Sequence, residues 1–176
     1  NSAVSGIGGI YIYQNSYSGN VEINNTIFDG NTTPLSSGAL QINADGSFKG
    51  YANNCTFKNN TATTTGGAVR LYAYDADLND FDFNNCLFDN NTAGDNGGAA
   101  YIQTDLRGIF ANKFDNCVFN KNKAARGGAL YLTASNYAAN ISVPLTNCTI
   151  ANNNATIESG GIYVTKANSS AAVRAD

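Results

Sequence analysis

Short alternations of apolar and polar residues recur along the chain about every thirty residues. In Cys55–Phe57 and in Val69–Leu71, for example, the first and third residues are apolar and would share one face of a strand. Such alternation is typical of a β-strand that is buried on one side. No window of eleven or more residues follows the 3.6-residue period of a helix. The pattern therefore predicts an all-β protein made of many short strands.

Two motifs carry these alternations, and each repeats at a nearly constant spacing. The first reads NNCTFKNNTA, NNCLFDNNTA, DNCVFNKNKA and TNCTIANNNA, and its cysteines follow one another at intervals of 31 residues. An earlier copy, NNTIFDGNTT, has Thr26 at the cysteine position. The second motif starts at a glycine and reads GGIYI, GALQI, GAVRL, GAAYI, GALYL and GGIYV. A fixed period of this length indicates a solenoid, in which each coil packs only on its neighbours.

A parallel β-solenoid accounts for three short strands per repeat joined by glycine and asparagine corners. Each strand would pair with its equivalent in the next coil, about 4.8 Å along the axis. We expect residues 1–176 to form a single β-helix domain of five to six coils, with about 30 residues and three strands per coil. Residues 165–176 are expected to form a polar tail, and the chain is interpreted as a fragment of a longer one.

The same alternation places three kinds of side chain in interior rows, where equivalent residues of successive coils would stack. Asparagine suits a corner, where its amide can bond the next amide and its backbone tolerates a left-handed conformation. The motif glycine would serve another corner, through positive φ or close backbone approach. The predicted ladders are Cys55, Cys86, Cys117 and Cys148; Phe28, Phe57, Phe88 and Phe119; and Asn31, Asn60, Asn91, Asn122 and Asn153.

Composition excludes several classes of function. Histidine is absent, which removes the commonest general base, the commonest zinc ligand and every histidine-containing catalytic triad. Charged residues make up only 13% of the chain and the net charge is -3, so no broad basic face is available for nucleic acid. The sequence has no apolar run of eighteen residues, so we expect no membrane span within it.

The paired motifs GGAV with FKNN, GGAA with FDNN and GGAL with FNKN resemble a known repeat. They are similar to the repeats of the polymorphic outer membrane protein family of autotransporter adhesins, and the similarity runs from about Gly8 to Val164. The resemblance implies a right-handed parallel β-helix that is extracellular or displayed at a cell surface and serves in adhesion or as a stalk. We therefore expect a non-catalytic protein that presents a binding surface.

The four cysteines favour a buried column of thiols. Zinc sites use short CxxC pairs whose thiolates converge from different directions, whereas these residues share one strand position in four consecutive coils. The alternative is one or two bonded pairs, such as Cys55 with Cys86 and Cys117 with Cys148, in an oxidising medium. We expect no metal, cofactor or catalytic residue.

Outward positions of the second motif supply the candidate partner surface. Tyrosine and arginine are common at interfaces, although tyrosine also simply suits an exposed strand. The expected partners are a host-cell, matrix or glycan surface, or other copies of the chain. The candidate residues are Tyr11, Arg70, Tyr101, Tyr131 and Tyr163, in a row that also contains Gln41. A second outward row is unusually apolar and would be covered by a loop or a partner: Ile27, Thr56, Leu87, Val118 and Thr149.

Two other functions remain open at this point. Open strand edges at the first and last coils would suit a self-assembling fibre or sheath, whose subunits stack end to end. Alternatively, an acidic stretch resembles the calcium-binding carboxylates of polysaccharide lyases built on β-helices, which also need a basic residue. The carboxylates concerned are Asp75, Asp77, Asp80 and Asp82, and the basic candidates are Arg70 and Arg107.

Overall fold

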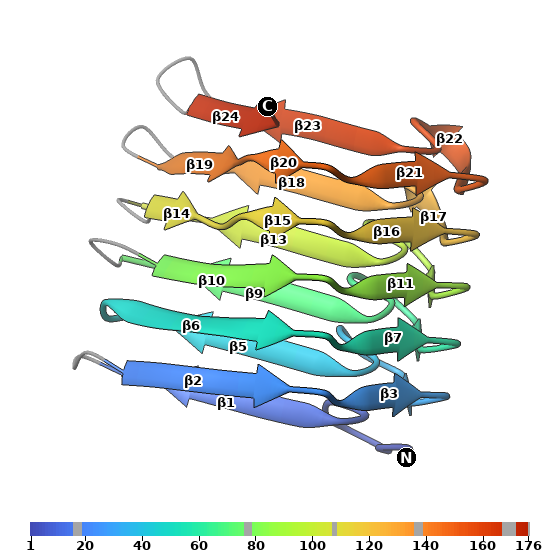
Figure 1. Cartoon of the computed structure of the whole chain (residues 1–176), viewed down its shortest axis with the longest axis horizontal. Coiled ribbons are helices and arrows are strands. Elements are labelled where there is room, and N and C mark those ends of the chain that lie inside the picture. Colours follow the sequence, from blue (N-terminus) through green and yellow to red (C-terminus); the bar gives the residue numbers. More distant parts are fainter. Residues whose placement is uncertain (16–18, 76–78, 107–108, 136–138, 167–171, 176) are drawn as a thin grey trace.

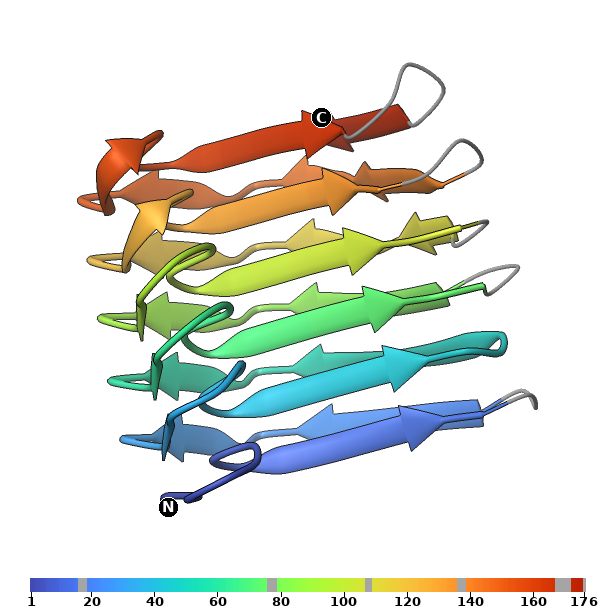
Figure 2. The ribbon, with the colours of Figure 1, turned by 180° about the vertical axis from the view of Figure 1, so that it is seen from behind.

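The computed structural model describes residues 1–15, 19–75, 79–106, 109–135, 139–166 and 172–175. The described residues form strands and turns without any helix, which confirms the all-β prediction. Figures 1 and 2 show the strands stacked in coils along one axis, with residue numbers rising from coil to coil. With no helix present, the described residues contain none that could cross a membrane.

Each strand pairs in parallel with its equivalent in the next coil, so the sheets run along the solenoid. The first sheet lies nearest the viewer in Figure 2 and contains β1 (Ile10–Gln14), β5 (Leu40–Ala44), β9 (Val69–Ala73), β13 (Ala100–Thr104), β18 (Leu130–Ala134) and β23 (Ile162–Lys166). The second sheet lies nearest the viewer in Figure 1 and contains β2 (Gly19–Asn24), β6 (Phe48–Asn53), β10 (Asn79–Asn84), β14 (Ile109–Ala111), β15 (Phe114–Asp115), β19 (Asn140–Val143), β20 (Leu145–Thr146) and β24 (Ala172–Ala175).

Two further sheets complete each coil at the right-hand end of Figure 1. The third sheet contains β3 (Ile27–Asp29), β7 (Thr56–Lys58), β11 (Leu87–Asp89), β16 (Val118–Asn120) and β21 (Thr149–Ala151). The fourth consists of short strands at the corner: β4 (Thr32–Thr33), β8 (Thr61–Ala62), β12 (Thr92–Ala93), β17 (Lys123–Arg126) and β22 (Asn154–Glu158). Each coil therefore has three principal strands and a short fourth.

The direction of the chain sets the hand of the solenoid. In Figure 1 it passes from left to right along β2 and β3, returns behind along β5, and rises by one coil with each circuit. This path is right-handed. The registers are constant within the first sheet; Tyr101, for example, pairs with Tyr131 and with Arg70. In the fourth sheet the register shifts once, between Ala124 and Arg126, where β17 pairs with β22. The prediction of a right-handed parallel β-helix with about three strands per coil is confirmed.

The corners differ from the sequence prediction in one respect. The sequence pattern assigns the left-handed backbone conformation to the ladder asparagines themselves. The structure instead places positive φ one residue earlier, at Asn59 (φ 56) and Asn90 (φ 53), and at the residue before each cysteine, such as Asn85 (φ 54). A left-handed residue at that point turns the chain so that the next side chain points inward. Asparagine is among the few non-glycine residues that tolerate this conformation.

The glycine of the second motif is explained by close backbone approach. A Cβ atom added to Gly98 would lie 2.1 Å from the carbonyl oxygen of Gly128 in the next coil, which no side chain can accommodate. Positive φ belongs to the residue before it, Gly97 (φ 67). The two consecutive glycines thus satisfy different requirements of the same corner.

The interior is filled by phenylalanine rings stacked along the axis. Phe88 stacks on Phe57 at 4.9 Å and on Phe119 at 4.8 Å between ring centroids. Rings from the second sheet meet this column edge-on, since Phe83 and Phe114 lie 5.5 Å and 6.0 Å from Phe88. Both arrangements are favourable geometries for aromatic pairs. The column joins the second and third sheets into one core.

The structure describes part of residues 165–176, and that part does not form the expected polar tail. Thr165 and Lys166 are the last residues of β23, and Ala172–Ala175 form β24, which pairs with β19. The described part of residues 165–176 therefore continues the solenoid. The strand β24 reads Ala-Val-Arg-Ala, so this part of the segment is not a polar sequence.

Candidate functional site

The four cysteines lie in one interior column as free thiols, three of them buried and Cys148 partly exposed. The Sγ atom of Cys86 lies 3.3 Å from the carbonyl oxygen of Ala52 and 3.4 Å from that of Asn84, so the thiol can donate to either. Contacts with the thiols of Cys117 and Cys55, followed by burial, raise the pKa of Cys86. No cluster of three or more potential metal ligands occurs among the described residues.

A thiol reagent should distinguish these cysteines in the folded protein. Cys148 is expected to react first because it is the one with solvent exposure, and Cys55, Cys86 and Cys117 are expected to react only when the protein unfolds. Mass spectrometry of tryptic peptides after brief labelling, with and without denaturant, measures this order. Rapid labelling of all four thiols in the native protein would contradict the buried column.

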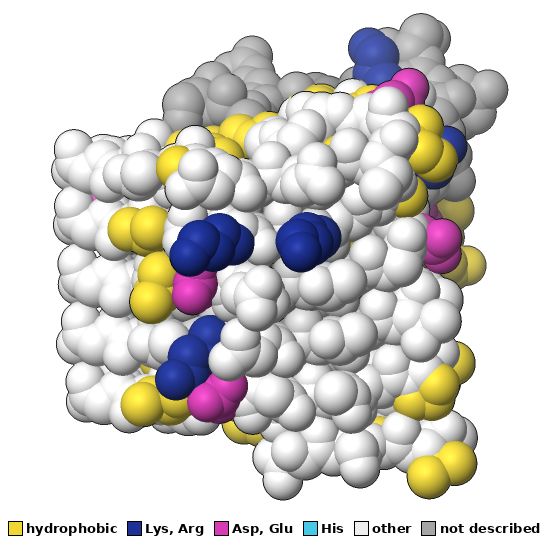
Figure 3. Space-filling view, turned by 90° about the vertical axis from the view of Figure 1, so that its right-hand side faces the viewer, with side chains coloured by type: hydrophobic (Ala, Val, Ile, Leu, Met, Phe, Trp, Pro, Cys, Tyr) yellow, Lys and Arg dark blue, Asp and Glu magenta, His cyan; other side chains and the backbone are white. Residues whose placement is uncertain are grey.

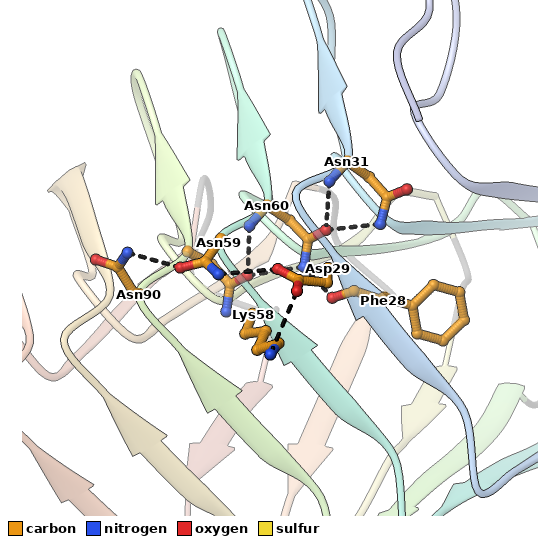
Figure 4. A network of polar contacts seen from close by, with 8 residues as sticks. Phe28, Asp29, Asn31, Lys58, Asn59, Asn60 and Asn90 are labelled. Atoms are coloured by element: carbon orange, nitrogen blue, oxygen red, sulfur yellow. Dashed lines mark hydrogen bonds and ion pairs between the residues drawn. The ribbon is translucent and has the colours of Figure 1, made fainter.

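The ladder asparagines form a continuous chain of side-chain amides behind the outer corner (Figure 4). The Nδ2 group of Asn60 donates to the Oδ1 atom of Asn91 at 2.9 Å and to the carbonyl oxygen of Phe28 at 2.9 Å. The backbone N–H of Asn60 donates to the same Oδ1 atom at 3.0 Å. Asn60, Asn91 and Asn122 are buried, so these bonds satisfy groups that water cannot reach. The ladder is thus structural.

The outward side of the first sheet, which we call the tyrosine face, carries a stack of phenol rings. The centroids of Tyr101 and Tyr131 are 5.2 Å apart, and those of Tyr131 and Tyr163 are 5.1 Å apart. Tyr11 lies exposed on β1, at the other end of the row. Gln41, between Tyr11 and Arg70 in the register, is only 7% exposed although its position points outward.

Arg70 links the tyrosine stack to a second outward row. Its guanidinium lies 4.8 Å from the ring centroid of Tyr72 and 5.9 Å from that of Tyr101, within the range of cation–π attraction. It also donates to the Oδ1 atom of Asn43 at 3.2 Å. The hydroxyl of Tyr72 donates to Asp105 at 2.8 Å. The side chains of this face are therefore held in place before any partner arrives.

Sequence reasoning missed the second row, which consists of Tyr13, Asn43, Tyr72, Gln103, Thr133 and Thr165. These residues lie two positions beyond the predicted row and therefore face the same way. The signal was present in the alternation of the second motif. Burial raises the pKa of Tyr101 to about 12, and its hydroxyl donates to Gln103 at 3.1 Å. Tyr101 thus remains a neutral hydrogen-bonding group at physiological pH.

Among the described residues, Asp80 and Asp82 are not brought together with Arg70. Asp80 and Asp82 lie on β10 in the second sheet, whereas Arg70 lies on β9 on the opposite side of the solenoid (Figures 1 and 2). Asp77 and Arg107 lie outside the described residues. Burial, followed by the neighbouring charge of Asp80, raises the pKa of Asp82. The Oδ1 atom of Asp82 accepts the backbone N–H of Lys113 at 2.9 Å.

The apolar outward row of the third sheet is exposed in this chain. Ile27 is 68% exposed, Leu87 36% and Val118 38%. Figure 3 shows acidic and basic side chains gathered in a column beside hydrophobic ones. Within that column the Nζ atom of Lys58 lies 3.3 Å from the Oδ2 atom of Asp29 (Figure 4). Apolar and oppositely charged groups are therefore side by side on one surface.

These features place the chain in the class of right-handed parallel β-solenoids built from short repeats. Residues 54–71, 85–103 and 116–133 match the Chlamydia polymorphic membrane protein repeat, which confirms the resemblance drawn from the two motifs. No curated protein and no solved structure matches the chain. The matched repeat and the fold are consistent with a surface adhesin-like protein and with a place at the outer membrane or cell surface.

Proposed function

We propose that this chain is a non-catalytic surface β-helix that binds a glycan or matrix partner through its tyrosine face. The observation that supports the proposal is the continuous run of phenol, amide and guanidinium groups around Arg70, fixed by the contacts between Tyr72, Asp105, Tyr101 and Gln103. Hydroxyls, amides and a cation are the groups that hydrogen-bond to sugar hydroxyls and carboxylates.

Preorganisation is what makes this face suited to binding. A side chain that is immobilised only on binding costs about 0.5 to 1.5 kcal/mol of lost rotamer freedom. Tyr101 and Tyr131 are already stacked, and Gln103 is held by Asp105 at 3.2 Å. Tyrosine and arginine are also the residue types that carry most of the binding energy at interfaces. The tyrosine face can therefore bind without first ordering its side chains.

Replacing both Tyr101 and Tyr131 with serine is expected to weaken binding to an array of host-cell glycans and matrix proteins by at least about tenfold. The matched control is Tyr51→Ser, because Tyr51 lies on β6 in the second sheet, away from this face. Binding is measured by surface plasmon resonance at low protein concentration, with circular dichroism to establish that each variant is folded. Equal loss of binding in the control would contradict the proposed face.

A polysaccharide lyase or hydrolase is the competing function, and the same preparation tests it. Pectic, uronic and neutral polysaccharides are incubated with the chain in the presence of calcium, and unsaturated or reducing ends are measured. The proposal expects no turnover. Turnover that is abolished by Asp80→Asn or Asp82→Asn would overturn it, because these two carboxylates are the acid–base candidates.

End-to-end stacking of copies is a second candidate function. The observation that favours it is that β1 and β23 each pair with one strand only among the described residues, and each leaves an edge along the axis. The side chains of Ile10 and Val164, which belong to interior rows, are exposed at these two coils. A copy stacked there would pair the edge and cover the apolar side chains. Filaments seen by negative-stain electron microscopy would support this function.

A further inference from the structure

Arg70 differs from the other cationic side chains that the structure describes. Three of those are paired with a carboxylate: Lys58 with Asp29, Lys113 with Asp115 and Arg126 with Glu158. Four are exposed to water: Lys49, Lys121, Lys123 and Lys166. Arg70 is partly buried, yet no described carboxylate lies at ion-pair distance from it. Burying a cation without a counter-charge is unfavourable, so an anion bound beside Arg70 would be stabilised.

The guanidinium group of Arg70 has hydrogen-bond donors that its neighbours do not use. A guanidinium carries five N–H groups in one plane. Among the described residues, those of Arg70 make one hydrogen bond, from Nη1 to the Oδ1 atom of Asn43 at 3.2 Å. The rings of Tyr72 and Tyr101 attract the cation, with centroids 4.8 Å and 5.9 Å from its central carbon. This attraction does not supply an acceptor to any N–H group, so donors remain for a ligand.

We propose that Arg70 is the part of the tyrosine face that binds the carboxylate of an acidic polysaccharide, one that contains uronic acid residues. The proposal rests on the proposed function and names the class of glycan that this face would select. A guanidinium binds a carboxylate through two parallel N–H···O bonds, which are stronger than bonds between neutral groups and also fix the orientation of the ligand. Arg70 is thus a specificity-determining residue, and the tyrosines around it bind the neutral part of the sugar.

The acid that lies nearby orients the face and does not neutralise Arg70. Burial lowers the pKa of Arg70, and Asp105 is the one carboxylate among the groups that oppose this effect. The Oδ2 atom of Asp105 accepts the hydroxyl of Tyr72 at 2.8 Å, and its Oδ1 atom accepts the amide of Gln103 at 3.2 Å. Asp105 follows β13, whereas the equivalent position after β9 is Tyr74. The coil that carries Arg70 therefore has no acid at this turn position.

The groups around Arg70 favour a sugar polymer over an acidic peptide. The rings of Tyr101 and Tyr131 are stacked with their centroids 5.2 Å apart, so each ring covers part of the face of the other. Stacked rings present their hydroxyl edges to a partner and leave little apolar area for peptide side chains. The amides of Gln103 and Asn43 add neutral donors and acceptors. A uronic acid residue matches this mixture, because it carries one carboxylate and several hydroxyls.

Arg70 is the one cation in the two outward rows of the first sheet, which lies nearest the viewer in Figure 2. The whole chain has a net charge of -3, so a polyanion gains no general attraction to the protein. Preferential binding of an acidic polymer would therefore require a local site. A single substitution at Arg70 should then remove the preference for the acid.

Hyaluronan and its carboxyl methyl ester are matched ligands for the test, because the ester keeps the sugar backbone and removes the charge. Binding of each polymer to the chain is measured by isothermal titration calorimetry at neutral pH. A chelator is present, so that calcium does not bridge the polymer to carboxylates of the protein. The chain is expected to bind the acid at least about tenfold more tightly than the ester, since charge-assisted hydrogen bonds are the stronger ones.

Arg70→Gln is expected to weaken binding of the acid by at least about tenfold and to leave binding of the ester unchanged. Unchanged binding of the ester establishes that the rest of the face is intact in this variant. Arg70→Lys keeps the charge but cannot present two parallel N–H groups, so it is expected to bind the acid more weakly than Arg70 does. Lys49→Gln removes an exposed cation from β6 in the second sheet and is the matched control, expected to bind both polymers as the original chain does.

The salt dependence of binding tests the role of charge independently of the shape of the ligand. Raising the concentration of sodium chloride is expected to weaken binding of hyaluronan and to leave binding of the ester nearly unchanged, because salt screens the attraction between exposed charges. In Arg70→Gln the two polymers are expected to show the same small dependence on salt. A salt dependence that survives this substitution would place the interacting cation elsewhere and contradict the role of Arg70.

Three results would overturn the proposal: no binding of hyaluronan, equal affinity for the acid and the ester, or full affinity of Arg70→Gln for the acid. Tighter binding of polyglutamate than of hyaluronan at Arg70 would reassign the ligand to an acidic peptide. In each of these cases, loss of glycan-array binding in the variant with Tyr101→Ser and Tyr131→Ser would leave the proposed function standing without this specificity. Conversely, hyaluronan binding that depends on Arg70 but not on Tyr101 and Tyr131 would contradict the wider tyrosine face and retain the carboxylate contact.

Discussion

Replacing Asn91 with alanine is expected to lower the free energy of unfolding by about 4 kcal/mol, one of the two largest effects of a single change in this chain. The Oδ1 atom of Asn91 accepts two bonds from Asn60, and its Nδ2 group donates to Phe57 and Asn122. Alanine removes all four bonds and leaves the backbone N–H of Asn60 buried without a partner. Unsatisfied buried groups cost about 1 to 3 kcal/mol each.

Two further variants distinguish the contribution of the buried amide ladder to stability from that of the neighbouring residues. Asn90→Gly removes an exposed amide at the preceding left-handed position, which glycine tolerates, and is expected to change stability by less than about 1 kcal/mol. Asn91→Asp keeps the shape but cannot donate as a carboxylate. Burial raises the pKa of such a group, so this variant should lose stability as the pH rises from acidic to neutral. Equal effects of Asn90→Gly and Asn91→Ala in urea denaturation would contradict the role of the ladder.

Phe88→Ala is the second change with a large expected effect, a loss of about 3 to 5 kcal/mol. The ring is fully buried, is stacked on both sides and is met edge-on by Phe83 and Phe114. Its removal leaves a cavity in the middle of a stack whose neighbours are held by backbone pairing and cannot collapse into it.

Phe28→Ala provides the matched comparison within the same column. Among the described residues, Phe28 stacks on Phe57 alone, at 4.8 Å, and it retains 6% exposure, so its removal should cost distinctly less than that of Phe88. Both variants are compared by urea denaturation followed by circular dichroism. A cost for Phe28→Ala equal to that for Phe88→Ala would show that stacking on the second side contributes nothing.

The repeat made the fold predictable, since strand alternation and a constant period place each residue relative to its equivalents in other coils. The interior position of Cys86 and Phe88 followed from the alternation of inward and outward residues alone. The corner at Asn90 and Asn91 was less predictable, because two adjacent asparagines differ only in which of them takes positive φ. The local sequence does not show which of the two asparagines has positive φ. The stacking of Asn91 against the next coil determines it.

The surfaces were only partly predictable for a related reason. Parity identifies outward positions such as Tyr101, but not which neighbours across the strands hold them; the contacts of Arg70 with Tyr72 and Asn43 depend on side-chain rotamers.

The direction of the hydrogen bonds between coils makes the mechanical strength of the solenoid depend on the direction of the applied force. These bonds run along the axis, so tension on the axis loads one coil at a time and should peel coils away in succession. A pull along the strands, applied at the tyrosine face, is shared by β9, β13 and β18 and loads their bonds in shear. A surface protein of this design would resist lateral drag on a bound partner better than extraction along its length.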